Sequence, residues 1–233
     1  MARESKKDGV FASLQTVLQL GFIGAAAVAV FSFVSVSRDS EMRRRCTPLC
    51  MLRPNYAAAN RKAPNFTLKD MKGKDVTLAS LAGKVVVMNF WTKTCGPCME
   101  EMPEVAELAR VLSTHDDVAF LTVSTDEGPE AVRDVLGAVL RFGPNKELPF
   151  PVLFDPDMTV VGDKFGTHLF PETWILDKRG VVRARFDGAR SWTNPVVVEL
   201  VEQIANDGYC PAEFTDGRPS REAQRLCGTG NVN

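Results

Sequence analysis

The stretch VVVMNFWTKTCGPCMEEMPEVAEL, residues 85–108, decides the fold of this chain. Residues 85–91 are apolar apart from one asparagine and predict a buried strand, whereas residues 99–112 predict a helix. The tetrapeptide Cys-Gly-Pro-Cys lies at their junction, at residues 95–98. A C-x-x-C pair alone fits either redox chemistry or half of a zinc site. Its place between a strand and a helix favours a cysteine pair that closes and opens a disulfide.

The start of the predicted helix gives the two cysteines different expected roles. Only a thiolate attacks a disulfide, and the unpaired N–H groups and the dipole at a helix start favour a negative charge. Cys95 is therefore the expected nucleophile, and Cys98, three residues along the same face, can attack the mixed disulfide that Cys95 forms. Zinc would need two more ligands, and the two histidines, His115 and His168, lack ligand-like spacing. We expect neither a metal nor a cofactor.

Composition and charge limit the partners and divide the chain. A net charge of −1 over 233 residues, without a basic aromatic cluster, argues against a nucleic-acid partner. No charged residue lies between Asp8 and Arg38, and about 20 apolar residues suffice to cross a bilayer as a helix. We therefore expect a short tail over residues 1–9 and a membrane anchor over 10–37. A cleaved signal peptide is the alternative, because residues 25–29 resemble a cleavage site, but the apolar run continues beyond them.

The rest of the chain alternates strands and helices and then forms a hairpin. Residues 38–62 mix charges, prolines and an alanine run, so a linker is expected there. The elements predicted beyond it are a hairpin over 67–78, a strand at 118–123, a helix at 129–142, an extended segment at 151–154, a helix at 158–165, a hairpin over 173–186 and a helix at 195–205. A parallel strand–helix–strand unit joined to an antiparallel hairpin predicts an α/β fold, with a mixed central sheet flanked by helices on both faces.

Several separated motifs together resemble a known family. They are Asn89-Phe90-Trp91, the two cysteines with Gly96-Pro97, Glu101, Met102-Pro103, and the downstream run FPETWILD at residues 170–177. In order and spacing they resemble the membrane-anchored thioredoxin-like proteins of bacteria, the TlpA, ResA and CcmG (DsbE) group. The resemblance covers roughly residues 63–205. It implies a thioredoxin-like domain over residues 63–206, followed by a cysteine-containing tail over 207–233.

The resemblance implies roles for five positions. Cys95 would be the exposed nucleophile and Cys98 the buried resolving thiol. Pro171 would be a cis-proline that faces the disulfide and shapes the groove in which a substrate strand docks. Phe170 would offer its backbone to that strand, and Trp91 is assigned with them to substrate binding.

The carboxylates near the motif have two interpretations. Ordinary thioredoxins carry a buried aspartate where this chain has Asn89, whose amide cannot titrate. In ResA-like proteins a glutamate at the place of Glu101 tunes the thiols and handles the proton of Cys98, which a partly buried carboxylate could do. The alternative is a solvated charge on the helix, like Glu100 and Glu104. Glu172 matches the CcmG-like branch, but its role could be purely that of a surface residue.

Two departures from the family leave questions open. Most relatives carry tryptophan before the first cysteine, where this chain has Thr94, which puts partner choice in doubt. Cys46 and Cys50 have the C-x₃-C spacing that binds copper in another thioredoxin-like family, although a disulfide or pairing with the tail is favoured. Cys210 and Cys227 bracket a polar segment and are expected to staple it. The sequence does not give the connectivity.

The expected function is that of a periplasmic thiol-disulfide oxidoreductase that reduces disulfides in client proteins. Apocytochrome c in cytochrome c maturation, or a cysteine-based copper site in oxidase assembly, would be the client, and a membrane thiol carrier of CcdA or DsbD type would supply electrons. Peripheral cysteines such as these four persist as disulfides in an oxidising compartment, which favours a bacterial inner-membrane protein with its soluble domain in the periplasm. The alternatives are a net disulfide oxidant or isomerase, and a copper-binding metallochaperone.

Overall fold

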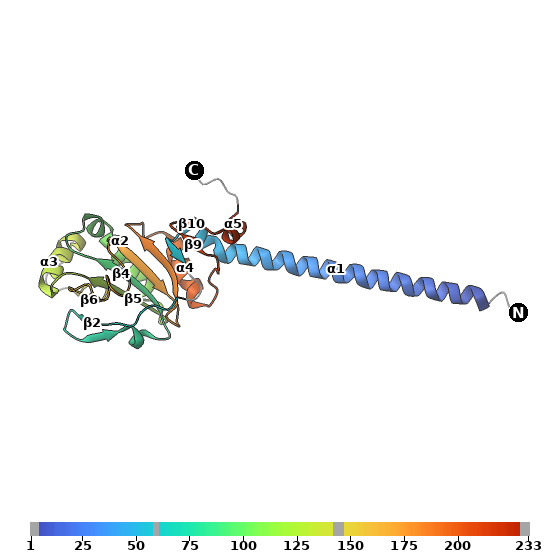
Figure 1. The fold of residues 1–233 in the computed structure, drawn as a ribbon, viewed down its shortest axis with the longest axis horizontal. Helices are drawn as coiled ribbons and strands as arrows, with labels where there is room; N and C mark the ends of the chain where they lie inside the picture. Colours follow the sequence, from blue (N-terminus) through green and yellow to red (C-terminus); the bar gives the residue numbers. More distant parts are fainter. Residues whose placement is uncertain (1–4, 58–60, 142–146, 229–233) are drawn as a thin grey trace. The chain divides into compact units, whose positions relative to one another are not determined.

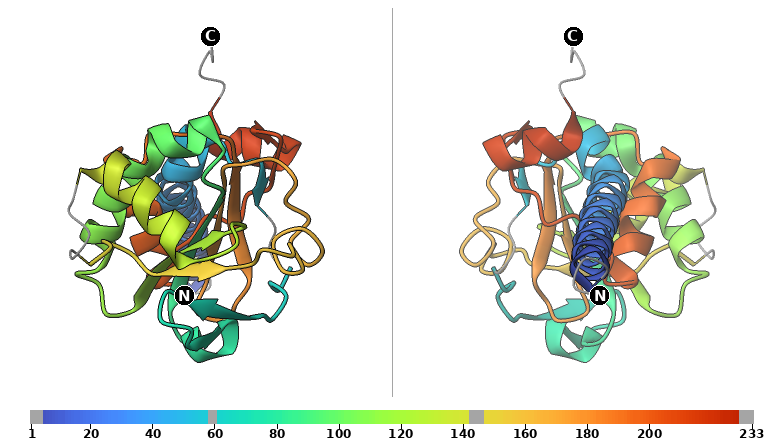
Figure 2. Two further views of the ribbon diagram at one scale, coloured as in Figure 1. Left: turned by 90° about the vertical axis from the view of Figure 1, so that its left-hand side faces the viewer. Right: turned by 90° about the vertical axis from the view of Figure 1, so that its right-hand side faces the viewer.

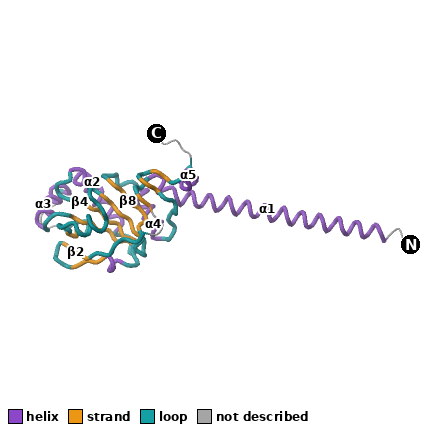
Figure 3. The backbone as a smooth tube through the Cα atoms, viewed as in Figure 1, coloured by secondary structure: helices purple, strands orange, loops and turns teal. Residues whose placement is uncertain are grey.

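The computed structural model describes residues 5–57, 61–141 and 147–228. The chain divides into two compact units, Met1–Arg44 and Arg45–Asn233, and each is described by itself. Figure 3 shows where helices, strands and loops fall along the backbone.

The first unit is formed by helix α1, Ser5–Leu52, whose last residues belong to the second unit. The helix begins earlier than the predicted anchor, and residues 1–4 of the predicted tail lie outside the described residues. Its large apolar side chains between Val17 and Val36 are exposed, Phe22 to 75% and Phe31 to 74%. By length and composition this helix could cross a membrane.

Within the described residues, ten strands form one sheet in the second unit, in the order β10-β9-β1-β8-β7-β4-β5-β6-β2-β3. Figure 1 shows part of this sheet, with β4, β5 and β6 labelled. Their bounds are β1 Tyr56–Ala57, β2 Thr67–Asp70, β3 Asp75–Thr77, β4 Val85–Trp91, β5 Val118–Ser124, β6 Val152–Phe154, β7 Glu172–Leu176, β8 Val182–Asp187, β9 Phe214–Thr215 and β10 Arg218–Pro219. Both predicted hairpins are confirmed, as the antiparallel pairs β2–β3 and β7–β8.

Strand β4 lies at the centre of the sheet because its side chains are apolar on both faces. All seven of its residues are buried. It pairs in parallel with β5 and antiparallel with β7, so the sheet is mixed as predicted. On one face Val86, Met88 and Phe90 join the main apolar cluster with Trp174 and Phe165. The ring of Phe165 meets those of Phe90 and Trp174 edge-on at 5.2 Å.

Helices α2, α3 and α4 lie together on one side of the sheet in both views of Figure 2. Their bounds are Gly96–Leu112, Pro129–Leu140 and Pro195–Ala205. Helix α2 contacts α3, α4 and β5. The last residue of the helix predicted at 129–142 lies outside the described residues.

On the opposite face of the sheet, the helix predicted at residues 158–165 is wrong, because these residues form a series of turns. Met158 has a positive φ of 55°, which an α-helix does not accept. The carboxylate of Asp155 then accepts hydrogen bonds from the backbone N–H groups of Val160 and Val161, at 3.0 and 2.7 Å. A buried side chain thus replaces part of the helical hydrogen-bond pattern that the apolar spacing predicts.

The end of helix α1 replaces part of the predicted linker. Residues 45–52 are helical, with Cys46 and Leu49 buried in the second unit. Because Cys46 and Cys50 are four residues apart, they lie on one face of the helix. That face is held by two disulfides, Cys46–Cys210 and Cys50–Cys227.

The C-terminal segment belongs to the fold and is more than the tail that the sequence predicts over 207–233. Its strand β9 pairs with β1, which in turn pairs with β8, so the segment extends the sheet at that edge. Helix α5, Arg221–Cys227, follows β10. The predicted staple within this segment is wrong, because Cys210 and Cys227 each pair with helix α1 and not with one another.

Candidate active site

The candidate active site begins with a disulfide between Cys95 and Cys98 at the first turn of α2. Cys95 is the N-cap residue, and its sulfur accepts a hydrogen bond from the backbone N–H of Cys98 at 3.2 Å. Cys95 is half-buried, whereas Cys98 has no exposed surface. Of the two sulfurs, only that of Cys95 belongs to a residue that an incoming disulfide can reach.

The motif lies at the start of α2 because β4 ends just before it and Pro97 is compatible with the first turn of a helix. Strand β4 ends at Trp91, and residues 92–94 connect it to α2. A proline in the first helical turn has no N–H to leave unsatisfied. Once the disulfide is reduced, the N–H of Cys98 and the positive end of α2 both favour a thiolate on Cys95.

A buried carboxylate lies one helical turn beyond Cys98. Glu101 is 4% exposed, so it is not the solvated helix charge that was the alternative interpretation. One carboxylate oxygen accepts a hydrogen bond from the side-chain amide of Asn89 at 3.0 Å. The other accepts hydrogen bonds from the indole N–H of Trp192 at 2.9 Å and the backbone N–H of Arg190 at 3.2 Å. Burial raises the pKa of Glu101, and these hydrogen bonds oppose that rise.

Asn89 connects this carboxylate to the neighbouring strand. Its amide nitrogen donates both to Glu101 and to the hydroxyl of Thr173 on β7, each at 3.0 Å. Its amide oxygen is buried and has no hydrogen-bond partner among the residues that the structure describes. Glu101 and the amide of Asn89, which cannot titrate, therefore form one buried hydrogen-bonded group.

The peptide bond between Phe170 and Pro171 is cis, as expected. Pro171 is buried and immediately precedes β7, whose first residue, Glu172, is opposite Phe90 near the end of β4. Because β4 and β7 are antiparallel neighbours, the start of β7 and the end of β4 lie next to each other at the same strand ends. The cis-proline and the segment that leads into Cys95 therefore lie at that end of the sheet.

Glu172 is a buried residue, which the sequence did not establish. It is 6% exposed, and one of its carboxylate oxygens accepts hydrogen bonds from the hydroxyl of Thr167 and from the indole N–H of Trp174. Burial raises its pKa. The surface role considered for Glu172 is therefore wrong. The signal that could have found it is its place directly after the proline, at the start of a predicted strand that continues as the apolar run Trp174-Ile175-Leu176.

Trp91 is not a docking residue in this structure. Its side chain is fully buried in β4, and its indole N–H has no hydrogen-bond partner among the described residues. Thr94 and the exposed Leu169, at 83% exposure, lie on the segments that flank the disulfide and the cis-proline. Phe170 is half-buried and packs against the apolar cluster.

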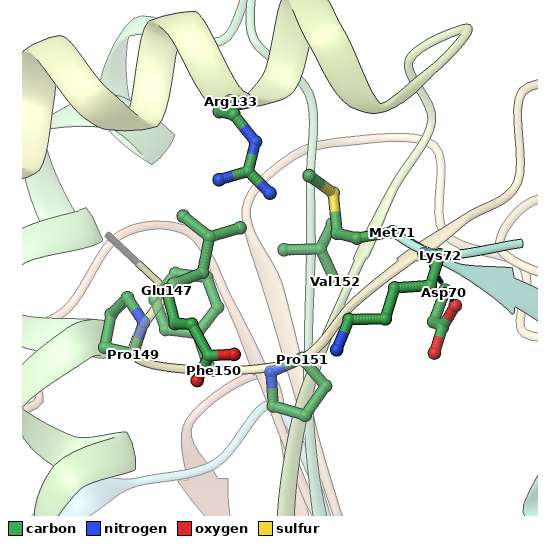
Figure 4. Close-up of a pocket in the computed structure, with 10 residues that line it drawn as sticks. Asp70, Met71, Lys72, Arg133, Glu147, Pro149, Phe150, Pro151 and Val152 are labelled. Atoms are coloured by element: carbon green, nitrogen blue, oxygen red, sulfur yellow. Dashed lines mark hydrogen bonds between the residues drawn. The ribbon is translucent and has the colours of Figure 1, made fainter. Parts of the chain in front are cut away.

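The remaining cysteines and the cavity beside α3 lie outside this constellation. All six cysteines are in disulfides, and the described residues contain no group of three or more His, Cys, Asp or Glu that could hold a metal ion. A cavity of about 510 Å³ between α3, the turn after β2 and residues 147–152 has Lys72, Arg133 and Phe150 in its lining (Figure 4). No residue of the disulfide site lines it.

Comparison with known proteins is consistent with this geometry. A family model described as Redoxin matches residues 58–201. The thioredoxin-like protein YneN of Bacillus subtilis is 30% identical over 98 residues, which cover 42% of this chain and 53% of YneN. The thiol-disulfide oxidoreductase ResA of Halalkalibacterium halodurans is 32% identical over 120 residues, which cover 51% of this chain and 61% of ResA. The chain thus spans between about half and three fifths of these curated relatives.

Solved structures give the same fold. A candidate thioredoxin from Neisseria meningitidis is 29% identical with a TM-score of 0.51, and the match covers 64% of this chain and 93% of that protein. A candidate thiol:disulfide interchange protein DsbE from Chlorobium tepidum is 25% identical with a TM-score of 0.50, covering 66% and 98%. The thioredoxin-like fold is therefore confirmed, and so is the resemblance to the ResA and DsbE group.

Proposed function

This chain belongs to the redoxin family, and from that premise we propose that it is a thiol-disulfide oxidoreductase of the ResA and DsbE type. The observation that carries the proposal is the asymmetric disulfide at the start of α2. A half-buried Cys95 receives the N–H of a fully buried Cys98, so one sulfur can meet a client and the other can only resolve the product.

The proposed reaction is the reduction of a client disulfide in two exchange steps. The Cys95 thiolate attacks one client sulfur, forms a mixed disulfide and releases the other client sulfur as a thiolate, which takes a proton from water. Cys98 then passes its proton to Glu101 and attacks Cys95. The second client sulfur leaves as a thiolate. Two electrons pass to the client, and the Cys95–Cys98 disulfide is re-formed.

Glu101 suits the second step because it is buried one helical turn from the resolving thiol on the same helix. Its raised pKa, caused by burial, brings its proton affinity nearer to that of a thiol than the affinity of an exposed glutamate would be. Pro171 and the backbone of Phe170 are proposed to receive an extended client segment at the end of the sheet that they share with the disulfide.

We propose that the protein is anchored by α1 in a bacterial inner membrane, with the second unit in the periplasm. The apolar, exposed side chains of α1 support an anchor, and the two long-range disulfides support an oxidising compartment. A membrane thiol carrier of CcdA or DsbD type would then re-reduce the Cys95–Cys98 disulfide. Disulfide-bearing apocytochrome c or an oxidase copper-site protein is the proposed client.

The copper interpretation of Cys46 and Cys50 finds less support. A thiolate is the copper ligand, and both sulfurs are in disulfides with Cys210 and Cys227. Net oxidation or isomerisation of clients uses the same cysteine pair as reduction, so only the potential separates these activities. A reduction potential near −270 mV, as in thioredoxin, supports reduction, whereas one near −120 mV, as in DsbA, indicates an oxidant.

Trapping tests the assignment of roles. A Cys98→Ser variant should accumulate mixed disulfides through Cys95, because the second step is blocked, and these should dissolve on adding dithiothreitol. Non-reducing gels with mass spectrometry identify the trapped clients. The matched control is Cys95→Ser with Cys98 intact. Equal trapping by the control would reverse the two roles, and no trapping by either variant would refute the exchange mechanism.

A further inference from the structure

The loop between β8 and α4, residues 188–194, contacts α2 through two carboxylates. Trp192 and the backbone of Arg190 donate to the same oxygen of Glu101. One turn further along α2, Glu104 accepts from both the backbone N–H and the hydroxyl of Thr193, each at 3.3 Å. The loop is therefore fastened to the helix that carries the cysteine pair.

Packing fixes the indole of Trp192, which makes the shorter of the two hydrogen bonds from this loop to Glu101. Trp192 is 2% exposed. Its ring meets that of Phe186 edge-on, with 5.8 Å between the ring centroids and an angle of 81° between the planes. An indole held in this way can donate in only one direction, and that direction is occupied by Glu101.

Arg190 fixes the loop from its other side. Its guanidinium donates to the carbonyl of Leu52, the last residue of α1, at 2.9 Å and to the side-chain oxygen of Asn55 at 3.1 Å. It also lies over the ring of Phe186, 4.9 Å from the centroid. The backbone N–H that binds Glu101 is thus held by a side chain bound to the end of α1, two residues after Cys50.

We propose that Trp192 and Arg190 are positioning residues that hold the Glu101 carboxylate ionised and oriented for the proton of Cys98. This inference rests on the proposed function. In every hydrogen bond that the structure gives Glu101, the carboxylate is the acceptor, so all of these bonds favour the charged form. Without the loop, the same burial would leave the carboxyl group protonated over a wider pH range, in a form that cannot accept a proton.

The other charged and titratable groups around Glu101 act in known directions. Glu104, one turn along α2, disfavours a second negative charge nearby, and Cys98 is the proposed proton donor. Asn89, which approaches from β4, does not titrate. Glu172 follows Pro171 on β7 and is one residue from Thr173, the residue that faces Asn89, so its side chain points to the opposite face of the sheet.

The chain offers a matched control for the indole. Trp174 donates to the buried Glu172 at 2.6 Å, as Trp192 donates to the buried Glu101. The substitutions Trp192→Phe and Trp174→Phe each keep an aromatic ring and remove one indole N–H from one buried carboxylate. Each substitution therefore removes a donor from a different buried carboxylate.

The first measurement is the titration of Glu101 itself, followed by carboxyl ¹³C NMR in the full chain labelled with [¹³C]glutamate, in the oxidised state. A hydrogen bond to a charged group corresponds to a shift of about one pH unit or more. We expect Trp192→Phe to move the Glu101 midpoint upward by about that amount, and Arg190→Met to move it the same way by less. Trp174→Phe should move only Glu172. An unmoved Glu101 midpoint in Trp192→Phe overturns the inference.

The second measurement links the carboxylate to exchange. The reduced protein is mixed with glutathione disulfide from pH 5 to 9, and glutathione formation is followed by acid quench and mass spectrometry. Glu101→Gln identifies the part of the pH profile that depends on Glu101. Trp192→Phe should shift that part to higher pH by the same amount as the NMR midpoint, and adding it to Glu101→Gln should shift nothing further.

The two proposals fail in different ways. If the wild-type protein exchanges with glutathione disulfide but Trp192→Phe has an unchanged pH profile, the positioning role is refuted and the exchange function stands. If the wild-type protein does not exchange at any pH, the proposed function is refuted, even where the NMR midpoint moves. A further shift in the double variant would show that Trp192 acts on exchange by a route other than Glu101.

Discussion

The Cys95–Cys98 disulfide and the two disulfides at the end of α1 are the same covalent bond in different surroundings. The first joins residues separated by 3 positions, at a helix start and with one half-buried partner. The others join residues separated by 164 and 177 positions. A short loop costs the unfolded chain little entropy when it is closed, whereas a long loop costs more. We infer that the first disulfide opens during thiol-disulfide exchange and that the other two stabilise the fold.

Removing the half-buried sulfur of the Cys95–Cys98 pair should have the strongest effect on activity. Cys95→Ser should lower the rate of insulin reduction, followed by turbidity with dithiothreitol as the electron source, to the uncatalysed rate, because no thiolate remains to attack the client. The control is the double variant Cys46→Ser/Cys210→Ser, which should keep a rate close to that of the wild type. If the double variant were as inactive as Cys95→Ser, the two kinds of disulfide would not have separate roles.

Removing a long-range disulfide should lower the free energy of unfolding more than removing Cys95–Cys98. With Cys50–Cys227 intact, removing Cys46–Cys210 opens a loop of about 21 residues, which the chain-entropy estimate puts at about 3 kcal/mol of unfolding free energy. Removing Cys95–Cys98 opens a loop of a few residues, about 2 kcal/mol on the same scale. Urea unfolding of both double-serine variants under oxidising conditions measures the difference. A larger loss on removing Cys95–Cys98 would contradict the assignment.

A weaker effect on stability should come from Glu101, the buried carboxylate one helical turn from Cys98. The pKa of Glu101 is raised by burial in the folded state. The stability that it contributes is therefore fully present below the ordinary glutamate pKa and is lost as pH rises through the raised value. Relative to Glu101→Gln, the oxidised wild-type protein should thus become less stable as pH rises from about 4.3, the ordinary glutamate pKa, through the raised value.

Urea midpoints of the two proteins across that range give the measurement. Glu172→Gln should show the same direction, because burial raises the pKa of Glu172 as well. Glu107→Gln, at an exposed position on α2 where an ion pair with Arg110 lowers the pKa, serves as a control for the opposite sign. A difference between wild type and Glu101→Gln that is constant with pH would show that folding does not raise the pKa of Glu101.

Much of the fold could be predicted because each element has a local cause. The apolar run of β4, the glycine-containing turns of the two hairpins and the spacing of α4 all lie within a few neighbouring residues. The prediction failed at residues 158–165, where the apolar spacing resembles a helix but Asp155, outside the segment, binds the backbone. It failed again at residues 45–52, where two distant cysteines hold the chain.

Local sequence was enough to predict the cysteine pair at a helix start and the central strand, because a motif of adjacent residues and a run of apolar side chains have a local physical cause. The cis-proline at residue 171 was expected from the family resemblance. Only the tertiary structure decided which cysteines pair over long distances, that Glu101 and Glu172 are buried, and that Trp192 and Arg190 come from residues 188–194 to bind Glu101. Burial and long-range hydrogen bonds depend on which segments the fold brings together, and no local pattern encodes that.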